Sequence, residues 1–281
     1  MAGVRIVTDS ACDLTKDEAA ALQVEIVPLN IRFGAEEFTD GQNLSVQEFY
    51  RRMSEAEDLP ETSAPAPGAF EVAFRKLAAE GADAVVCINL SGGLSATIES
   101  ARNAARAVEG DIDVRVIDSR TLTAGLGTIV IAAAEAARDG RSVDEVVALV
   151  DDMVGRTRVY AALDTLDNLK KGGRIGGAQH LVGSMLAIKP LLNITGGEVE
   201  EAGKQRTRKK SLVWLRDKLF EEPRVEKLAV FDGEAPDVAE FLELISSRYG
   251  PDDIRTGRIG AVIGTHGGPR VMGICYLVER S

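Results

Sequence analysis

The stretch VIGTHGGPRVMGI, residues 262–274, contains His266, one of two histidines in the chain. Four glycines stand within seven positions of this imidazole: Gly264, Gly267, Gly268 and Gly273. Because glycine has no Cβ, a ligand can approach the backbone closely and the chain can adopt positive φ angles. A polar ring in such a loop predicts a small anionic group beside it. The alternative is a tight turn before a last strand, with His266 facing water.

The segment LSGGLSATIESA, residues 90–101, is a second candidate for chemistry. Ser95 falls near the start of a predicted helix, where a hydroxyl and free N–H groups form an anion site. The alternative is a plain N-cap, which serine commonly supplies. The chain has no GxxxxGK[ST], no GxGxxG after its first strand and no GxSxG. This argues against a P-loop, a dinucleotide site and an α/β-hydrolase nucleophile.

A catalytic triad is the enzymatic alternative for these residues. Asp9, Asp118 and His266 could join a serine, although nothing in their spacing requires it. The three cysteines lie far apart in sequence and form no CxxC or Cys/His cluster. The sequence therefore predicts neither a zinc site nor a disulfide framework.

The composition is that of a folded, acidic protein, with 45% hydrophobic residues and a net charge of −11. No apolar run approaches the roughly 20 residues that span a bilayer, and a nucleic-acid partner is not expected because phosphate contacts need a positive surface. The basic run KQRTRKK, residues 204–210, is either a solvated face or a patch that docks a partner or a phosphate. The N-terminal MAGVRIVTDS lacks signal-peptide features, so we expect a cytoplasmic protein.

Apolar runs alternate with amphipathic segments through the first half. Capping boxes mark three helix starts, at Thr15/Glu18, Ser45/Glu48 and Ser142/Glu145. Strands are predicted in VRIVTDS, VEIVPLNIRFG, EEFTDG, ADAVVCINLS and DVRVIDS. Strands separated by helices predict βαβ units and a largely parallel sheet. Since ligands bind beyond the carboxyl ends of such strands, this singles out residues 8–10, 91–93 and 118–119, and the TSAPAPG loop at 62–68 could lean over the same edge.

The second half predicts a compact α+β unit. LDTLDNLKKGGRIGG is expected to be a helix stopped by glycines, and IKPLLNITGGEVEEAGKQR a hairpin that turns at Gly196 and Gly197. Helices near 208–220 and 236–248 surround a strand in KLAVFDG. We therefore predict an α/β fold of two domains, a parallel-sheet βαβ domain at residues 1–157 and an α+β domain at residues 158–281.

Seven motifs of this chain resemble, in the same order, those of the DegV family of bacterial fatty-acid-binding proteins. They are IVTDSACDL, TSAPAPGAF, LSGGLSATIESA, VIDSRTLTAGLG, LDNLKKGGRI, KQRTRKK and VIGTHGGP. The resemblance covers essentially the whole chain. It implies two α/β domains with a long-chain fatty acid buried between them, and neither a metal nor a further cofactor.

The resemblance also implies which residues hold the ligand. The carboxylate would be held by Thr62 and Ser95, with His266 nearby to donate to it or later to an acyl phosphate. Some members carry the acyl chain for a fatty acid kinase, which implies a partner kinase that phosphorylates the bound carboxyl. Arg174 and Arg206 match basic positions of the family and would face that partner or the phosphate.

The chain departs from the family pattern at several positions, namely Ala64, Ala66, Gly92, Ala96, Ile98 and Arg270. Arg270 stands where glycine is usual, so a cation beside His266 could change the preferred head group. Five apolar residues are candidates for the tunnel wall, although such residues also form ordinary cores: Leu163, Leu166, Leu186, Ile188 and Leu192.

The sequence thus predicts a non-catalytic lipid carrier without stable membrane insertion. Two alternatives stay open. One is a lipid-sensing module that docks another protein through residues 204–210. The other is a hydrolase or transferase that uses Ser95 or His266.

Overall fold

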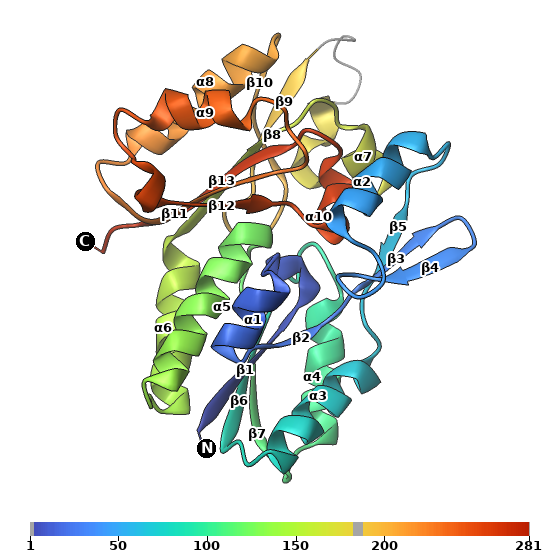
Figure 1. The fold of residues 1–281 in the computed structure, drawn as a ribbon, viewed down its shortest axis with the longest axis vertical. Coiled ribbons are helices and arrows are strands. Elements are labelled where there is room, and N and C mark those ends of the chain that lie inside the picture. The colour runs from blue at the N-terminus through green and yellow to red at the C-terminus, as the bar shows by residue number, and fades with distance from the viewer. Residues whose placement is uncertain (1–2, 182–187, 281) are drawn as a thin grey trace.

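The computed structural model describes residues 3–181 and 188–280. Figure 1 shows two stacked lobes, with the N-terminal half of the chain below and the C-terminal half above. In the lower lobe, parallel strands stand in the order β2-β1-β6-β7. They are β1 (Val4–Asp9), β2 (Glu25–Val27), β6 (Ala84–Asn89) and β7 (Asp113–Asp118). The predicted parallel sheet is confirmed.

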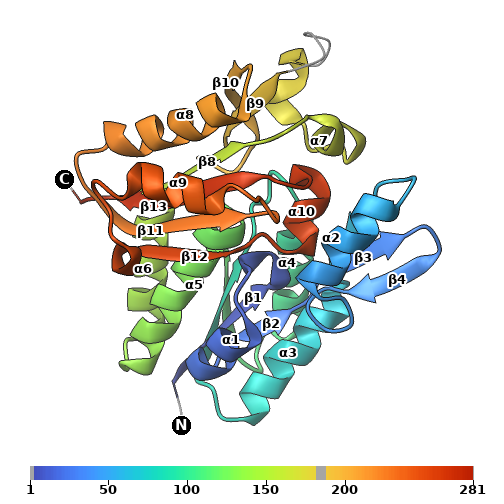
Figure 2. The ribbon, with the colours of Figure 1, turned by 45° about the horizontal axis from the view of Figure 1, so that its top comes forward.

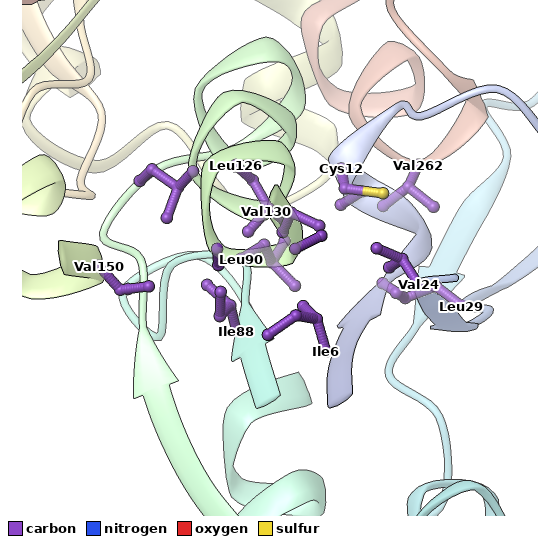
Figure 3. Close-up of a cluster of buried hydrophobic side chains, with 14 of the residues drawn as sticks. Ile6, Cys12, Val24, Leu29, Ile88, Leu90, Leu126, Val130, Val150 and Val262 are labelled. Atoms are coloured by element: carbon purple, nitrogen blue, oxygen red, sulfur yellow. The ribbon is translucent and has the colours of Figure 1, made fainter. Parts of the chain in front are cut away.

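Helices cover both faces of the lower sheet, because alternate residues of a strand point to opposite sides. Val85 and Cys87 of β6 pack with α3 and α4, whereas Val86 and Ile88 pack with α5 and α6. Figure 3 shows Ile88 near Leu126 on the second of these faces. The helices are α3 (Pro67–Ala79), α4 (Thr97–Ala107), α5 (Thr123–Arg138) and α6 (Val143–Arg156).

Local hydrogen bonds stabilise the helix starts that the sequence predicts. Thr15 and Glu18 make a reciprocal capping box at α1 (Lys16–Leu22), and Ser142 and Glu145 make another at α6. At α2 (Val46–Glu55), Ser45 accepts the Glu48 amide at 3.2 Å, while the Glu48 carboxylate pairs with Arg51 and Arg52. That box is therefore only half formed.

The upper lobe is built on a mixed sheet in the order β10-β9-β8-β13-β11-β12. Helices α8 and α9 cover one face, and the other face turns toward the lower lobe (Figure 2). The predicted hairpin is confirmed, since β9 and β10 pair antiparallel across Gly196 and Gly197. The elements are β8 (Thr157–Ala162), β9 (Lys189–Asn193), β10 (Glu200–Gln205), α8 (Arg208–Glu221), β11 (Val225–Asp232), α9 (Val238–Ile245), η3 (Pro251–Asp253), β12 (Ile254–Arg258) and β13 (Met272–Val278).

A third, small sheet has the order β4-β3-β5 and consists of β3 (Asn30–Phe33), β4 (Glu36–Thr39) and β5 (Glu61–Ser63). The run VEIVPLNIRFG therefore holds two strands in different sheets, β2 and β3, which Pro28 separates. Proline has no N–H to continue a strand ladder, which accounts for the break. β5 carries Thr62 to the junction of the two lobes.

The glycine-rich stretch around His266 is helical, so the expectation of a loop is wrong. Residues Ala261–Gly267 form α10, which packs against α2, α7 (Asp167–Lys171), β3 and β5. A Cβ at Gly264 would lie 2.6 Å from Tyr50 Oη, so glycine lets α10 approach α2 closely. Val262 of this upper-lobe helix lies in the core of the lower lobe (Figure 3). That packing fixes the helix, and with it His266.

The chain passes from one lobe to the other where α6 ends at Arg156 and β8 begins at Thr157. The domain limits at residues 157 and 158 stay a prediction. Within the described parts of the chain, no helix is both long enough and apolar enough to cross a bilayer.

Asp13 carries an unusual carboxylate at the junction of the lobes. It follows η1 (Ser10–Cys12), has a φ of 50°, and lies against Gly260, the N-cap of α10. Burial raises the pKa of Asp13 to about 7. The unfolded chain releases this proton at a much lower pH. Between about pH 7 and pH 4, the folded protein therefore binds a proton that the unfolded chain has released. Binding of this proton raises the free energy of unfolding as the pH falls through that window.

We expect Asp13→Asn to stabilise the protein above pH 7, by on the order of 1 kcal/mol, because it removes a buried charge. Asparagine tolerates positive φ and keeps an acceptor for the α10 terminus. Urea denaturation at about pH 8 and about pH 5 measures the effect, and the advantage of the variant should shrink at the lower pH. An advantage that is equal at both values would contradict the assignment.

Candidate ligand-binding site

A cavity lies between the lobes, on the face of the upper sheet that turns toward the lower lobe. It contains about 860 Å³ of space free of protein atoms, its open mouth included. Its apolar wall comes from both lobes and consists of Leu29, Leu90, Leu94, Leu122, Val159, Ala161, Leu163, Leu169, Leu192, Ile194, Val199, Ile259, Val262, Ile263 and Val271. Such a wall suits a hydrophobic ligand.

Two polar side chains from opposite lobes meet at this cavity. Thr62 of β5 and His266 in the last turn of α10 lie 204 positions apart in sequence, and their Oγ1 and Nε2 atoms are 2.9 Å apart. Both residues line the cavity. The hydrogen bond therefore connects the two lobes at the ligand site.

The other ring nitrogen of His266 is buried and has no hydrogen-bond partner among the described residues. It faces the backbone of Gly172, where an added Cβ would overlap Nδ1. Burial, assisted by the nearby Arg174 cation, lowers the pKa of His266 to about 4. A proton on Nδ1 would be a buried donor without an acceptor, which is costly. From this network we assign the proton to Nε2, so that His266 donates to Thr62 and leaves the threonine hydroxyl free to donate.

Helix α7 (Asp167–Lys171) and the segment that follows it connect α10 with the cavity. Asn168 is buried, and its Nδ2 donates to the Thr265 carbonyl at 3.0 Å. Arg174 lines the cavity, and its guanidinium donates to the carbonyls of Gly172 at 2.7 Å and Leu94 at 3.3 Å. These bonds orient the cation without neutralising its charge.

Ser95 also lines the cavity, at the entrance to α4. Its Oγ accepts the Thr97 amide at 3.3 Å and lies 2.9 Å from Thr97 Oγ1. The N-cap of α4 is Ala96, so Ser95 is not the plain N-cap of the alternative interpretation, although its hydroxyl accepts an N–H of the first turn. If Thr97 donates, the Ser95 proton is available to a ligand. Thr62, Ser95, Arg174 and His266 are therefore brought together at one cavity.

Replacing Gly172 with alanine should displace the imidazole, because the new methyl group would occupy the position of Nδ1. We expect the pKa of His266 to rise from about 4 toward 6.5 as the ring becomes hydrated. NMR titration in a His180→Gln background, which leaves one histidine, measures this directly. Lys170→Ala is the control, since its exposed side chain lines neither the cavity nor the contact with His266. A pKa that stays near its original value in Gly172→Ala would show that Gly172 does not position the ring.

The chain matches the model described as the DegV family over residues 3–279. It belongs to the DegV family. A DegV domain-containing protein of Deinococcus radiodurans is 38% identical over 277 residues, which cover 96% of this chain and 97% of the relative.

Solved DegV structures share the whole fold. A fatty-acid-binding DegV family protein from Thermus thermophilus has a TM-score of 0.89 and 32% identity, and the match covers 99% of this chain and 100% of that one. A stearic-acid-binding protein from Eubacterium ventriosum has a TM-score of 0.87 and 28% identity, with 98% of each chain covered. Both of these solved proteins bind fatty acids, and the two-lobed fold expected from the DegV motifs is confirmed.

Other residues singled out by the DegV resemblance lie elsewhere. Arg206 is exposed between β10 and α8 and does not line the cavity. Arg270 pairs with Asp164 at 3.4 Å and is absent from the cavity wall. The expectation that Arg270 influences the head group has no support from this geometry. Arg208 of the basic run forms an ion pair with Asp237 at 2.8 Å.

The carboxylates of the proposed triad serve the DegV fold instead. Asp9 accepts the Leu90 amide at 2.9 Å and the Asn89 side chain at 3.0 Å. Asp118 accepts the Arg120 amide of its own loop and the Gly92 amide of the neighbouring 91–93 loop. Neither bonds to His266. Ser91 donates to the Gly197 carbonyl at 2.6 Å, so the loop at 91–93 fastens the β9–β10 hairpin to the lower sheet.

Only some of the tunnel candidates line the cavity. Leu163 and Leu192 do, whereas Leu166 and Ile188 do not, and Leu186 lies outside the described residues. Sequence reasoning missed the cavity-lining residues of the two central strands of the upper sheet, where Ala161 of β8 stands opposite Gly273 of β13. A small residue among large apolar neighbours was the available signal.

Proposed function

We propose that this protein binds one long-chain fatty acid in the cavity and presents its carboxyl group to a partner kinase for acyl phosphate formation. The observation that carries the proposal is a single apolar cavity that also contains the Thr62–His266 pair, Ser95 and Arg174. Apolar walls suit the acyl chain, and the polar group suits its carboxylate. The fatty acids bound by DegV relatives support this assignment.

The acyl chain supplies the binding energy. About 15 methylene and methyl groups, at roughly 0.8 kcal/mol each, give a gross gain on the order of 12 kcal/mol. Part of this is lost to the ordering of chain and ligand. The remainder is enough to hold the lipid without a tight ion pair at its head.

The head group would meet hydroxyl donors from two lobes. With its proton on Nε2, His266 donates a hydrogen bond to the Thr62 hydroxyl. Thr62 and Ser95 then donate to the carboxylate oxygens. Hydrogen bonds to the ionised form lower the pKa of a carboxyl group, so the ligand stays a carboxylate at neutral pH. Arg174 adds a positive charge nearby, while its own donors are partly engaged with backbone carbonyls.

The kinase step needs that ionised oxygen as the nucleophile. A carboxylate oxygen forms the new bond to phosphorus, and the bond from phosphorus to the leaving group of the donor breaks, with the electron pair departing on that group. The protein would contribute position and electrostatics, which dominate phosphoryl transfer. The partner would contribute the phosphoryl donor. Arg206, exposed beside α8, is a candidate contact for that partner.

The enzymatic alternative receives less support from the same geometry. A general base works best when its pKa is near the working pH, whereas burial lowers the pKa of His266 to about 4. Its hydrogen-bond partner is a threonine rather than a serine and a carboxylate. The sensing module would differ from the carrier by binding lipid with no turnover when a kinase is added.

Native mass spectrometry of the purified protein tests the proposal. We expect a bound mass equal to a fatty acid of about 14 to 18 carbons, the length for which burial outweighs the cost of association. A clean ligand-free mass after gentle purification, with no uptake of added palmitate, would refute it.

A further inference from the structure

A second hollow, here called the outer cleft, lies on the other side of the Thr62–His266 pair. It runs between the β3–β5 side of the small sheet and the α7 segment. Thr62, Arg174 and His266 line both the inner cavity and the outer cleft. A carboxyl group held at these residues would therefore have its apolar chain on one side and the outer cleft on the other.

The charges of the outer cleft are unevenly paired. Arg32 forms an ion pair with Glu61. Within the described ranges 3–181 and 188–280, Lys171 has no hydrogen-bond or ion-pair partner and Arg174 donates only to backbone carbonyls. Asp58, also exposed, is the remaining acidic residue of the wall. His266 adds no charge because its imidazole is neutral near pH 7. The α7 wall thus offers two uncompensated cations in a chain whose net charge is −11.

We propose that the outer cleft is a phosphoryl-binding site, in which Lys171 and Arg174 hold the phosphate of an acyl phosphate whose chain fills the inner cavity. The inference rests on the proposed function. A phosphate group brings negative charge and several strong acceptor oxygens, which suits a fixed guanidinium beside a mobile ammonium. The inner cavity suits a phosphate less well, because its wall is largely apolar.

The test compares two ligands of equal chain length in three proteins. The ligands are palmitate and the β-ketophosphonate analogue of palmitoyl phosphate, in which a methylene group replaces the bridging oxygen and prevents hydrolysis. The proteins are delipidated wild type, Lys171→Ala and Lys170→Ala. Lys170 is the matched control, since it is an exposed lysine of the same helix and does not line the cleft.

We expect Lys171→Ala to weaken binding of the phosphonate about threefold to tenfold, as for a partly screened charge contact. Binding of palmitate should change less than about twofold, and Lys170→Ala should affect neither ligand. High salt should narrow the difference between wild type and Lys171→Ala. Equal effects of Lys171→Ala on both ligands, or on neither, would overturn the cleft assignment alone. If wild type binds neither ligand, the proposed function itself is wrong.

Discussion

Gly273→Leu is expected to abolish fatty-acid binding while leaving the ligand-free protein folded. Gly273 lies on β13 opposite Ala161 and on the same face as Cys275, so a side chain there points into the cavity. A Cβ would make only ordinary contacts, the nearest being the Phe231 carbonyl at 3.7 Å. Displacing even four methylene groups costs about 3 kcal/mol, so we expect affinity to fall at least about 100-fold.

Titration with palmitate by calorimetry, together with thermal unfolding of the delipidated protein, measures both consequences. The unfolding temperature should stay the same or rise, because leucine fills empty space. Gly273→Ala is the graded control and should bind within about threefold of wild type, since one methyl group displaces little of the ligand. Undiminished binding by Gly273→Leu would mean that the acyl chain lies elsewhere.

The double substitution Thr62→Ala with Ser95→Ala should abolish acyl phosphate formation and leave the fold intact. Each hydroxyl is expected to donate to a charged carboxylate, and such a bond contributes about 1.5 to 3 kcal/mol. Losing both should reduce turnover by the partner kinase at least about 100-fold. The acyl chain still binds, so the loss should exceed any loss of affinity for palmitate.

Substitutions that keep the hydroxyl groups distinguish a loss of head-group binding from a loss of folding. Thr62→Ser and Ser95→Thr keep the hydroxyl groups and should retain most of the turnover. Circular dichroism of the double variant should match wild type and its unfolding temperature should fall only slightly, because the two hydroxyls bond His266 and the first turn of α4 and lie outside the hydrophobic cores. Unchanged turnover in the double variant would exclude both residues as head-group ligands.

Local features of the fold could be predicted because few residues decide them. The boxes at Thr15/Glu18 and Ser142/Glu145 depend on one hydroxyl and one carboxylate three positions apart. The hairpin turn depends on two glycines, each with a φ near 95°. Alternating strands and helices predicted the parallel sheet for the same reason, since periodicity is a local property.

The helix around His266 could not be predicted, because its stability comes from distant partners. Glycine has a low intrinsic helix propensity, so four glycines near one histidine favour a loop. In the structure, Gly264 is what allows α10 to lie against Tyr50, whose hydroxyl donates to the Ile259 carbonyl at 3.0 Å. Tertiary packing here overrides local preference.

The sequence by itself determined the lobes in outline, the sheet type of the first, and the polar residues available for a ligand. Only the tertiary structure decided that Thr62 meets His266, that Arg174 joins them and Arg206 does not, and that Leu192 faces a cavity. The reason is physical: a side chain that faces a cavity and one that faces a core have the same apolar type and the same period. They differ only in what the tertiary structure places opposite them, and contacts between residues more than 100 positions apart establish this, such as the hydrogen bond from Ser91 to Gly197.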